Sequence, residues 1–227
     1  MKLLVSIDGA CRRNGKPDCT ASGGVFIQQF DEHQRRVACY TLSAYEYNST
    51  NQRGELLALL KALEHIFTAN MEALVVTDSE YIFNAMTKHW YVSWMNNNWQ
   101  TRSGDPVKNQ DIWMEIAHAM HLCECRRDID IAFYHVKGHC IPFGRVTAEN
   151  ALTKDTTGAL LHGLVQKRFD EVAPTKKTVF DAALELSMRN NGFEPDAIRF
   201  KEWVTANVVA DAIATKVVDA ADSLRKT

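Results

Sequence analysis

The chain has 227 residues, of which 46% are hydrophobic, so it can bury one substantial core. Its formal charge is −2, so no overall positive field draws it to nucleic acid, and any such contact must depend on local groups. We expect no membrane association, because no apolar run could span a bilayer and the N-terminal residues lack a signal-peptide pattern. The six cysteines have no paired C-x-x-C spacing, so we expect reduced thiols and a cytoplasmic protein.

Residues 2–10 predict a buried β-strand that ends in a carboxylate. Gly9 stops an apolar run that belongs to both faces of the strand and consists of Leu3, Leu4, Val5 and Ile7. Such a strand is typical of the middle of a sheet that is covered by helices. Asp8 therefore has two interpretations: it caps the following turn, or it presents a carboxylate in a crevice where cations or phosphates bind.

Two more strands and a helix are predicted next. Residues 23–30 and 35–45 have strand-like composition and are joined by a polar turn, so an antiparallel meander is expected. Thr50 can cap a helix that runs to about residue 68, with apolar residues at helical spacing. Glu55 lies in the first turn of this helix. It either complements the helix dipole or points into the same crevice as Asp8.

Residues 73–78 repeat the opening pattern, because a short apolar strand again ends in an aspartate, Asp78. Ser79 starts another helix, which is expected to end near residue 88. Two strands that end in aspartate and are separated by a helix predict a β-α-β crossover. Both carboxylates would then lie at the same edge of the sheet.

The segment from residue 90 to residue 107 is aromatic and polar, and its tryptophans include Trp94 and Trp99. It is either a loop pinned by tryptophans or an aromatic platform for nucleic acid. Residues 109–124 predict an amphipathic helix, and residues 128–136 predict a fifth strand.

His139 follows that strand in a loop, and a helix is expected to resume near residue 147. Glu149 and Asn150 would then lie at the same end of the sheet as the earlier acids.

Five short motifs occur in order along the chain: Ile7-Asp8-Gly9, Thr50-Asn51-Gln52-Arg53-Gly54-Glu55-Leu56, Val76-Thr77-Asp78-Ser79, the stretch from Pro106 to Trp113, and Val136-Lys137-Gly138-His139. In this order they resemble the type-one ribonuclease H family over residues 1 to about 160. The resemblance implies an α/β fold with a mixed five-stranded sheet, ordered 3-2-1-4-5 and flanked by helices. It also implies endonucleolytic cleavage of the RNA strand of RNA–DNA hybrids with two Mg²⁺ ions, for which Mn²⁺ can substitute.

The resemblance also implies roles for the acids. Asp8 would bridge both metals, Asp78 and Glu149 would serve one metal, and Glu55 the other. His139 would assist proton transfer or product departure. The family places its fourth acid ten residues after the loop histidine, which selects Glu149 rather than Asn150, although a glutamate stands where an aspartate is usual.

Substrate contacts follow from the same resemblance. Cys11, Asn14, Asn51 and Gln52 lie at positions that contact the minor groove, where the 2′-hydroxyls of RNA are exposed. Trp94 and Trp99 lie in the substrate handle, which is often rich in lysine and arginine in the family. Here the handle residues 95–98 are uncharged, which predicts weak electrostatic attraction to the hybrid.

We expect a catalytic domain at residues 1–158 and a helical extension at residues 159–227. The extension predicts helices over residues 159–169, 177–190 and 196–224. In the last of these, apolar residues recur at steps of three and four from Trp203 to Leu224, which favours packing against another helix. The partner of this stripe is left open: the extension itself, the catalytic domain, a second copy in a homodimer, or a foreign protein.

Two other function classes remain. A hybrid- or RNA-binding module that has lost catalysis is disfavoured, because such a module does not need several convergent charges. A phosphatase-like or sugar-kinase-like fold can also begin with Ile-Asp-Gly. However, Ala10 stands where the phosphatase pattern has a second aspartate, and residues 11–14 lack the glycine-rich phosphate loop of the kinase pattern.

Overall fold

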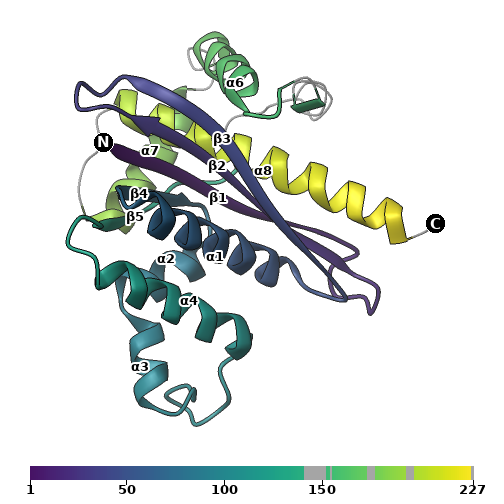
Figure 1. The fold of residues 1–227 in the computed structure, drawn as a ribbon. Helices are drawn as coiled ribbons and strands as arrows, with labels where there is room; N and C mark the ends of the chain where they lie inside the picture. The colour runs from purple at the N-terminus through teal and green to yellow at the C-terminus, as the bar shows by residue number, and fades with distance from the viewer. Residues whose placement is uncertain (141–151, 154, 173–176, 193–196, 226–227) are drawn as a thin grey trace.

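A computed structural model describes residues 1–140, 152–153, 155–172, 177–192 and 197–225. Its centre is a five-stranded sheet with the strand order β3-β2-β1-β4-β5 (Figure 1). Helices cover both faces of this sheet, so the predicted fold class and strand order are confirmed. Among the described residues, no helix is both long enough and apolar enough to cross a membrane.

The sheet is mixed because its central strand has one antiparallel and one parallel neighbour. β1 (Lys2–Arg12) pairs antiparallel with β2 (Thr20–Phe30) and parallel with β4 (Glu72–Thr77). β3 (Arg36–Tyr47) continues the meander beyond β2, and β5 (Ile131–His135) pairs parallel with β4. The two strands of the predicted β-α-β crossover are therefore neighbours, as expected.

The described helices are α1 (Asn51–Ala69), α2 (Glu80–Thr87), α3 (Trp90–Asn96), α4 (Gln110–Glu124), α6 (Ala159–Val172), α7 (Lys177–Asn191) and α8 (Ala197–Arg225). Six of them match predicted helices closely. The helix α3 is a correction, because its segment was expected to be an irregular loop. The helix expected near residue 147 begins outside the described residues.

Each face of the sheet has its own apolar core, because successive side chains of β1 point to opposite faces. Leu3, Val5 and Ile7 pack with α1 and α4. Leu4 packs on the other face, with α6 and α8. Figure 1 shows α8 running along the sheet on the side away from α1 and α4. By the same alternation, the side chain of Asp8 belongs to the face that α8 covers.

The helix α8 lies unusually close to the sheet at Gly24. A Cβ atom at this position would lie 2.5 Å from the backbone nitrogen of Ala214 and would also meet the carbonyl oxygen of Ala210. Only glycine leaves room for this approach of backbone to backbone. The apolar stripe of α8 thus packs on this chain's own sheet from Trp203 to Ile213, whereas Leu224 is 66% exposed.

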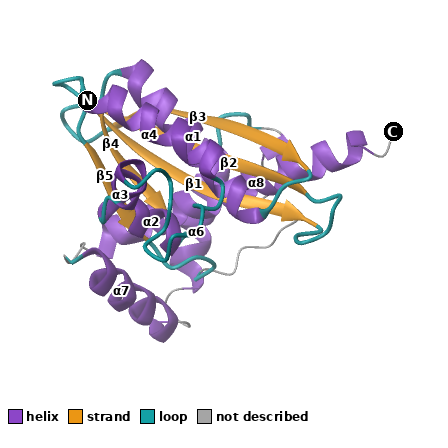
Figure 2. Ribbon diagram, turned by 90° about the horizontal axis from the view of Figure 1, so that it is seen from below, coloured by secondary structure: helices purple, strands orange, loops and turns teal. Residues whose placement is uncertain are grey.

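The other long helix of the extension, α7, lies at the edge of the sheet formed by β5 (Figure 2). The Asn191 side chain accepts a 2.8 Å hydrogen bond from the backbone N–H of His135 and donates one of 2.9 Å to its carbonyl oxygen. It therefore satisfies backbone groups at an exposed strand edge. The predicted boundary between a catalytic domain (residues 1–158) and an extension (residues 159–227) stays a prediction. The extension nevertheless supplies much of the core on the α8 side of the sheet.

Replacing Gly24 with alanine tests the close packing of α8 on β2. We expect Gly24→Ala to destabilise the protein by about 1–3 kcal/mol, because the added methyl group must push α8 away from β2. Gly163→Ala is the matched control: Gly163 lies within α6, its Cβ would meet nothing within 4 Å, and alanine favours the helix. Urea unfolding measures both. An unchanged midpoint for Gly24→Ala would mean that α8 does not pack on β2 in this way.

Candidate active site

Two predicted acids lie at the same level of the sheet. The parallel pairing of β1 with β4 ends at Ser6 and Val76, and Asp8 and Asp78 each follow two residues later. Neighbouring strands lie about 4.8 Å apart, so these two residues begin close together. The prediction that this strand ends at Asp8 was wrong, because β1 continues to Arg12, paired with β2 alone. The divergence of β1 from β4 leaves room at their junction.

Asp8 is a buried carboxylate in an acidic environment. It is 9% exposed, and this burial raises the pKa of its carboxyl well above the usual range. The charge of Asp78 raises the pKa further, followed by the charge of Asp211 and, more weakly, that of Glu55. The Gly9 N–H donates a 2.7 Å hydrogen bond to Asp8 Oδ1 and opposes the rise.

The start of α1 positions Glu55. The hydroxyl of the N-cap residue Thr50 accepts a 3.3 Å hydrogen bond from the Arg53 N–H, as predicted for a capped helix. The Arg53 guanidinium binds two carboxylates: Glu46 on β3 at 2.7 and 2.9 Å, and Asp111 on α4 at 2.7 and 2.8 Å. Paired hydrogen bonds of this kind fix geometry as well as charge. They anchor the turn that carries Glu55.

Glu55 points towards the ends of β1 and β4. Gly9 lies directly against its backbone nitrogen and its Cγ. The hydroxyl of Ser79, which follows Asp78, donates a 2.6 Å hydrogen bond to one carboxylate oxygen of Glu55, and Asn51 donates one of 3.1 Å to the other. Burial raises the pKa of Glu55 despite these bonds. The acids of β1, α1 and the β4 end thus lie near enough for their charges to interact, and their role as one metal site stays a prediction.

His139 lies beside Asp78. Burial raises the pKa of Asp78, and the nearby charge of His139 opposes this rise. A Cβ atom on Gly138 would collide with the Asp78 carboxylate, so a larger residue at that position would have to displace this side chain. His139 itself is exposed, which leaves its imidazole accessible.

His135 was not predicted to take part. Its Nε2 lies 3.2 Å from the carbonyl oxygen of Asp78, and its Nδ1 lies 3.1 Å from the side-chain nitrogen of Asn190 on α7. Burial lowers the pKa of His135. The extension therefore supports the backbone of an active-site candidate, and no sequence pattern signalled this contact.

Comparison with known proteins agrees with this geometry. A family model described as RNase H matches residues 1–153. This chain belongs to the RNase H family. The predicted ribonuclease H enzyme class is confirmed with it.

Two relatives named ribonuclease H illustrate the match. One, from Syntrophomonas wolfei, is 32% identical over 138 residues, which cover 61% of this chain and 84% of the relative. Another, from Actinobacillus succinogenes, is 32% identical over 164 residues, which cover 68% and 95% respectively. In fold, the chain is similar to LC9-RNase H1, described as a type 1 RNase H with the type 2 active-site motif, with a TM-score of 0.50, 18% identity and coverage of 94% of this chain and 85% of that one.

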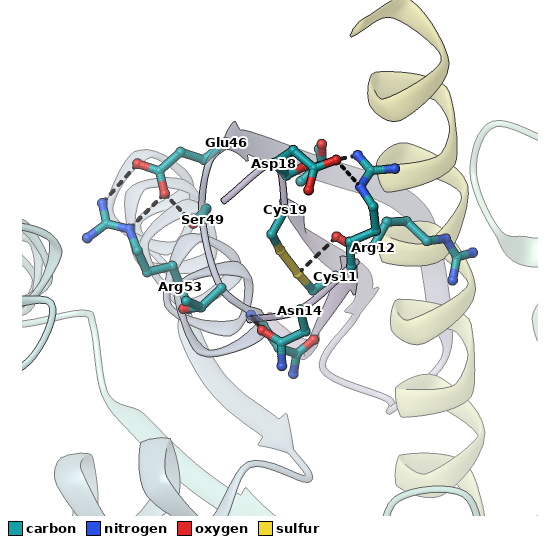
Figure 3. The surroundings of a disulfide bond; sticks show 12 residues. Cys11, Arg12, Asn14, Asp18, Cys19, Glu46, Ser49 and Arg53 are labelled. Atoms are coloured by element: carbon teal, nitrogen blue, oxygen red, sulfur yellow. Dashed lines mark hydrogen bonds and ion pairs between the residues drawn. A yellow bond between two sulfur atoms is a disulfide. The ribbon is translucent and has the colours of Figure 1, made fainter. Parts of the chain in front are cut away.

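The predicted groove residues of this RNase H-family chain form a connected row at the start of α1. The Asn14 side chain accepts a 3.3 Å hydrogen bond from the Asn51 N–H. Gln52 accepts one of 3.0 Å from the side chain of Asn109. Figure 3 shows Asn14 and Cys11 near the first turn of α1. Their contact with substrate stays a prediction.

The expectation of six reduced thiols was wrong, because Cys11 and Cys19 form a disulfide (Figure 3). The pairing arises from the β1–β2 hairpin, whose register brings Cys11 opposite Ala21, close to Cys19. A register of this kind could not be read from cysteine spacing. The remaining cysteines are free thiols.

Trp94 and Trp99 are half-buried and pack against the α1-side core. The ring centroid of Trp94 lies 5.3 Å from that of Trp113, in an edge-to-face arrangement. These contacts favour the interpretation that tryptophans pin this segment, and they leave substrate stacking by either ring a prediction. Glu149 and Asn150 lie outside the described residues.

The donor set fits the magnesium that the RNase H family implies. No group of three His, Cys, Asp or Glu side chains in the described ranges is already arranged to hold a metal ion. Mg²⁺, however, is usually held by only one or two carboxylates together with waters and substrate phosphates. Asp8, Glu55 and Asp78 would supply oxygen ligands. The charge of Asp78 raises the pKa of both Asp8 and Glu55, and a bound cation would relieve that repulsion.

The raised pKa of Asp8 predicts how metal-free protein responds to pH. The folded state holds the Asp8 proton more tightly than the unfolded chain does, so stability is lost as pH rises from about 3.9 through the raised pKa. Asp8→Asn removes this loss. In EDTA, we expect the variant to be more stable than the wild type at pH 8 and to lose this advantage as pH falls.

Denaturant unfolding between pH 4.5 and 8 measures the effect, and Asp128→Asn, at an exposed acid before β5, is the control. Lower stability of Asp8→Asn at pH 8 would contradict the account, because it would mean that the fold needs this carboxylate.

Proposed function

We propose that this RNase H-family enzyme hydrolyses the RNA strand of RNA–DNA hybrids by a two-metal mechanism. The observation that carries the proposal is the convergence of Asp8, Glu55 and Asp78 from three elements at the β1–β4 divergence. Among the described residues, no lysine or arginine forms an ion pair with any of them. An acidic cluster without a cationic partner suits divalent ions better than it suits a packed core.

The reaction explains why carboxylates are needed. Phosphodiester hydrolysis requires a nucleophilic water, relief of charge on the phosphate, and support for the leaving 3′-oxygen. Two divalent ions bound by these carboxylates would supply all three. Cleavage of this kind would leave 5′-phosphate and 3′-hydroxyl ends.

Each acid has a role that suits its surroundings. Asp8, on which the charges of both Asp78 and Glu55 act, would serve both ions. Asp78 would serve one ion and Glu55 the other, with Ser79 and Asn51 holding the Glu55 carboxylate in place. By resemblance, Glu149 would be the fourth acid.

His139 would act on the product side. Its imidazole is exposed in a loop next to Asp78, where it would assist proton transfer or product departure. The tight approach at Gly138 keeps this loop against the acids without fixing the ring itself.

Recognition of RNA would depend on the row at the start of α1. Asn14, Asn51 and Gln52 offer amide groups that can bond to 2′-hydroxyls in a wide minor groove. Each already has a protein partner that orients it, so the row is positioned before substrate binds.

Hybrid cleavage tests the proposed function. We expect Mg²⁺-dependent cleavage of labelled RNA in a hybrid, with Mn²⁺ as a substitute, and none in EDTA. Asp8→Asn and Asp78→Asn should each lower the rate by orders of magnitude, because each removes a charge that binds metal. Double-stranded RNA and single strands are the control substrates.

Full activity of Asp8→Asn would contradict the two-metal assignment. Tight hybrid binding without any cleavage by the wild type would instead indicate a binding module that has lost catalysis.

The uncharged handle gives a separate prediction. From residue 90 to residue 107 only Arg102 and Asp105 carry formal charge. Met95 and Asn96 are exposed at the end of α3, whereas the Asn97 side chain bonds to the carbonyl oxygen of Gln100. We therefore expect Met95→Lys combined with Asn96→Lys to tighten hybrid binding. Each new phosphate contact should steepen the slope of log affinity against log salt by about 0.7–0.9.

Fluorescence anisotropy across a salt series measures this slope. Val179→Lys combined with Ile198→Lys is the matched control, since it adds the same charge at exposed positions of the C-terminal helices. If the handle variant and the control have equal slopes, the handle does not approach the hybrid.

A further inference from the structure

The helix α8 carries an acid, Asp211, to which the sequence analysis gave no role. It lies in the middle of α8 and is half-buried. Its neighbours on the helix face the sheet: Asn207, one turn earlier, donates a 3.5 Å hydrogen bond to the carbonyl oxygen of Ile7. Residues four apart lie on the same face of a helix, so Asp211 is also directed towards β1.

Two contacts between α8 and β1 determine which residues of β1 lie opposite Asp211. Asn207 bonds to Ile7, and Asp219 accepts a 2.5 Å hydrogen bond from Arg12. Between these contacts α8 advances about 18 Å at 1.5 Å per residue, and β1 advances about 17 Å at 3.3 Å per residue. The helix and the strand therefore run alongside each other. Asp211 lies about 6 Å beyond Asn207, which is level with Asp8 and Gly9.

Packing against β2 gives the same level independently. Gly24, the cross-strand partner of Asp8, touches the backbone at Ala210 and Ala214, on either side of Asp211. The hydroxyl of Ser22, two residues away on β2, donates a 2.6 Å hydrogen bond to the carbonyl oxygen of Ala214. The two contacts prevent α8 from sliding along the sheet.

The charge of Asp211 acts on two of the proposed metal ligands. After burial and the charge of Asp78, it is the next largest cause of the raised pKa of Asp8, ahead of Glu55. It also contributes to the raised pKa of Asp78, after burial. These charge effects agree with the level of Asp211 along β1 that the packing contacts give.

Asp211 differs from the other acids in the second half of α8. Asp219 pairs with Arg12, and Asp222 pairs with Arg13. Within the described part of the chain, Asp211 has neither an ion pair nor a hydrogen bond to its carboxylate. It is thus a half-buried acid beside two others, and no cation of the described residues neutralises it, which costs stability unless a ligand compensates.

We infer that Asp211 is a carboxylate of the divalent-metal site, supplied by α8 on the side of Asp8 and Asp78. The inference rests on the proposed function. Asp211 would bind the metal directly or through one of its waters, as is usual for Mg²⁺. The C-terminal extension would then complete the active site as well as one core, and Asp211 would fill the fourth acidic position that resemblance assigns to Glu149.

Metal binding without substrate tests this inference. Isothermal titration of the full-length wild type with Mn²⁺ is compared with Asp211→Asn, Glu149→Gln and Asp181→Asn. Asp181, exposed on α7, is the control for loss of one charge from the extension. We expect Asp211→Asn to weaken binding at least about tenfold. Asp181→Asn should bind within about twofold of the wild type, and Glu149→Gln should weaken binding less than Asp211→Asn does.

Thermal unfolding separates a ligand from a structural group. In EDTA, Asp211→Asn should unfold at the same or a higher temperature than the wild type, because repulsion is removed. The rise in unfolding temperature on adding Mn²⁺ should be smaller in the variant. If the variant is less stable in EDTA and responds fully to Mn²⁺, Asp211 is structural and the inference is overturned.

The inference and the proposed function fail differently. If the wild type binds Mn²⁺ and cleaves hybrid, but Glu149→Gln loses binding while Asp211→Asn keeps it, the fourth acid is Glu149 and only the inference is wrong. If the wild type neither binds Mn²⁺ nor cleaves hybrid, the proposed function itself fails.

Discussion

The proposed site is arranged around the carboxylate of Asp8, which the fold buries among other acids. Asp8 lies where β1 leaves β4, near the charge of Asp78, and the next residue, Gly9, lies against Glu55 of α1. Burial and repulsion both raise its pKa, and one backbone N–H only partly opposes them. At Glu46, by contrast, a partly buried acid is paired with Arg53. The absence of such a pair among the described residues at Asp8 is what favours a bound cation.

Holding these acids together requires both cores. The core between the sheet and α1 and α4 holds the helix that carries Glu55, and Arg53 anchors the first turn of that helix. The core on the other face packs α8 against the sheet so closely that only glycine fits at position 24. The extension also reaches the site through α7, whose Asn190 and Asn191 hold His135 under Asp78. Stability of the extension and geometry of the site are therefore coupled.

Much of this could be predicted from sequence, because its signals are local. The apolar runs that end in Asp8 and Asp78, and the Thr50 cap before Glu55, depend on residues within one element. The features that were missed depend on register between distant elements. The Cys11–Cys19 disulfide depends on the register of the β1–β2 hairpin. The position of Asp211 beside Asp8 depends on how α8 packs against β1, a strand some 200 residues earlier in the chain. The helix α3 was missed because its aromatic and polar residues show no clear helical period.

The most direct test is to locate the metal. Crystals of the full-length chain with Mn²⁺ and a hybrid of non-hydrolysable RNA, measured at the manganese absorption edge, give the positions of the ions and their ligands. The account predicts manganese bound to Asp8, with Asp78 and Asp211 on one side and Glu55 on the other. Manganese bound without Asp8, or Asp211 turned away while Glu149 binds the ion, would contradict it.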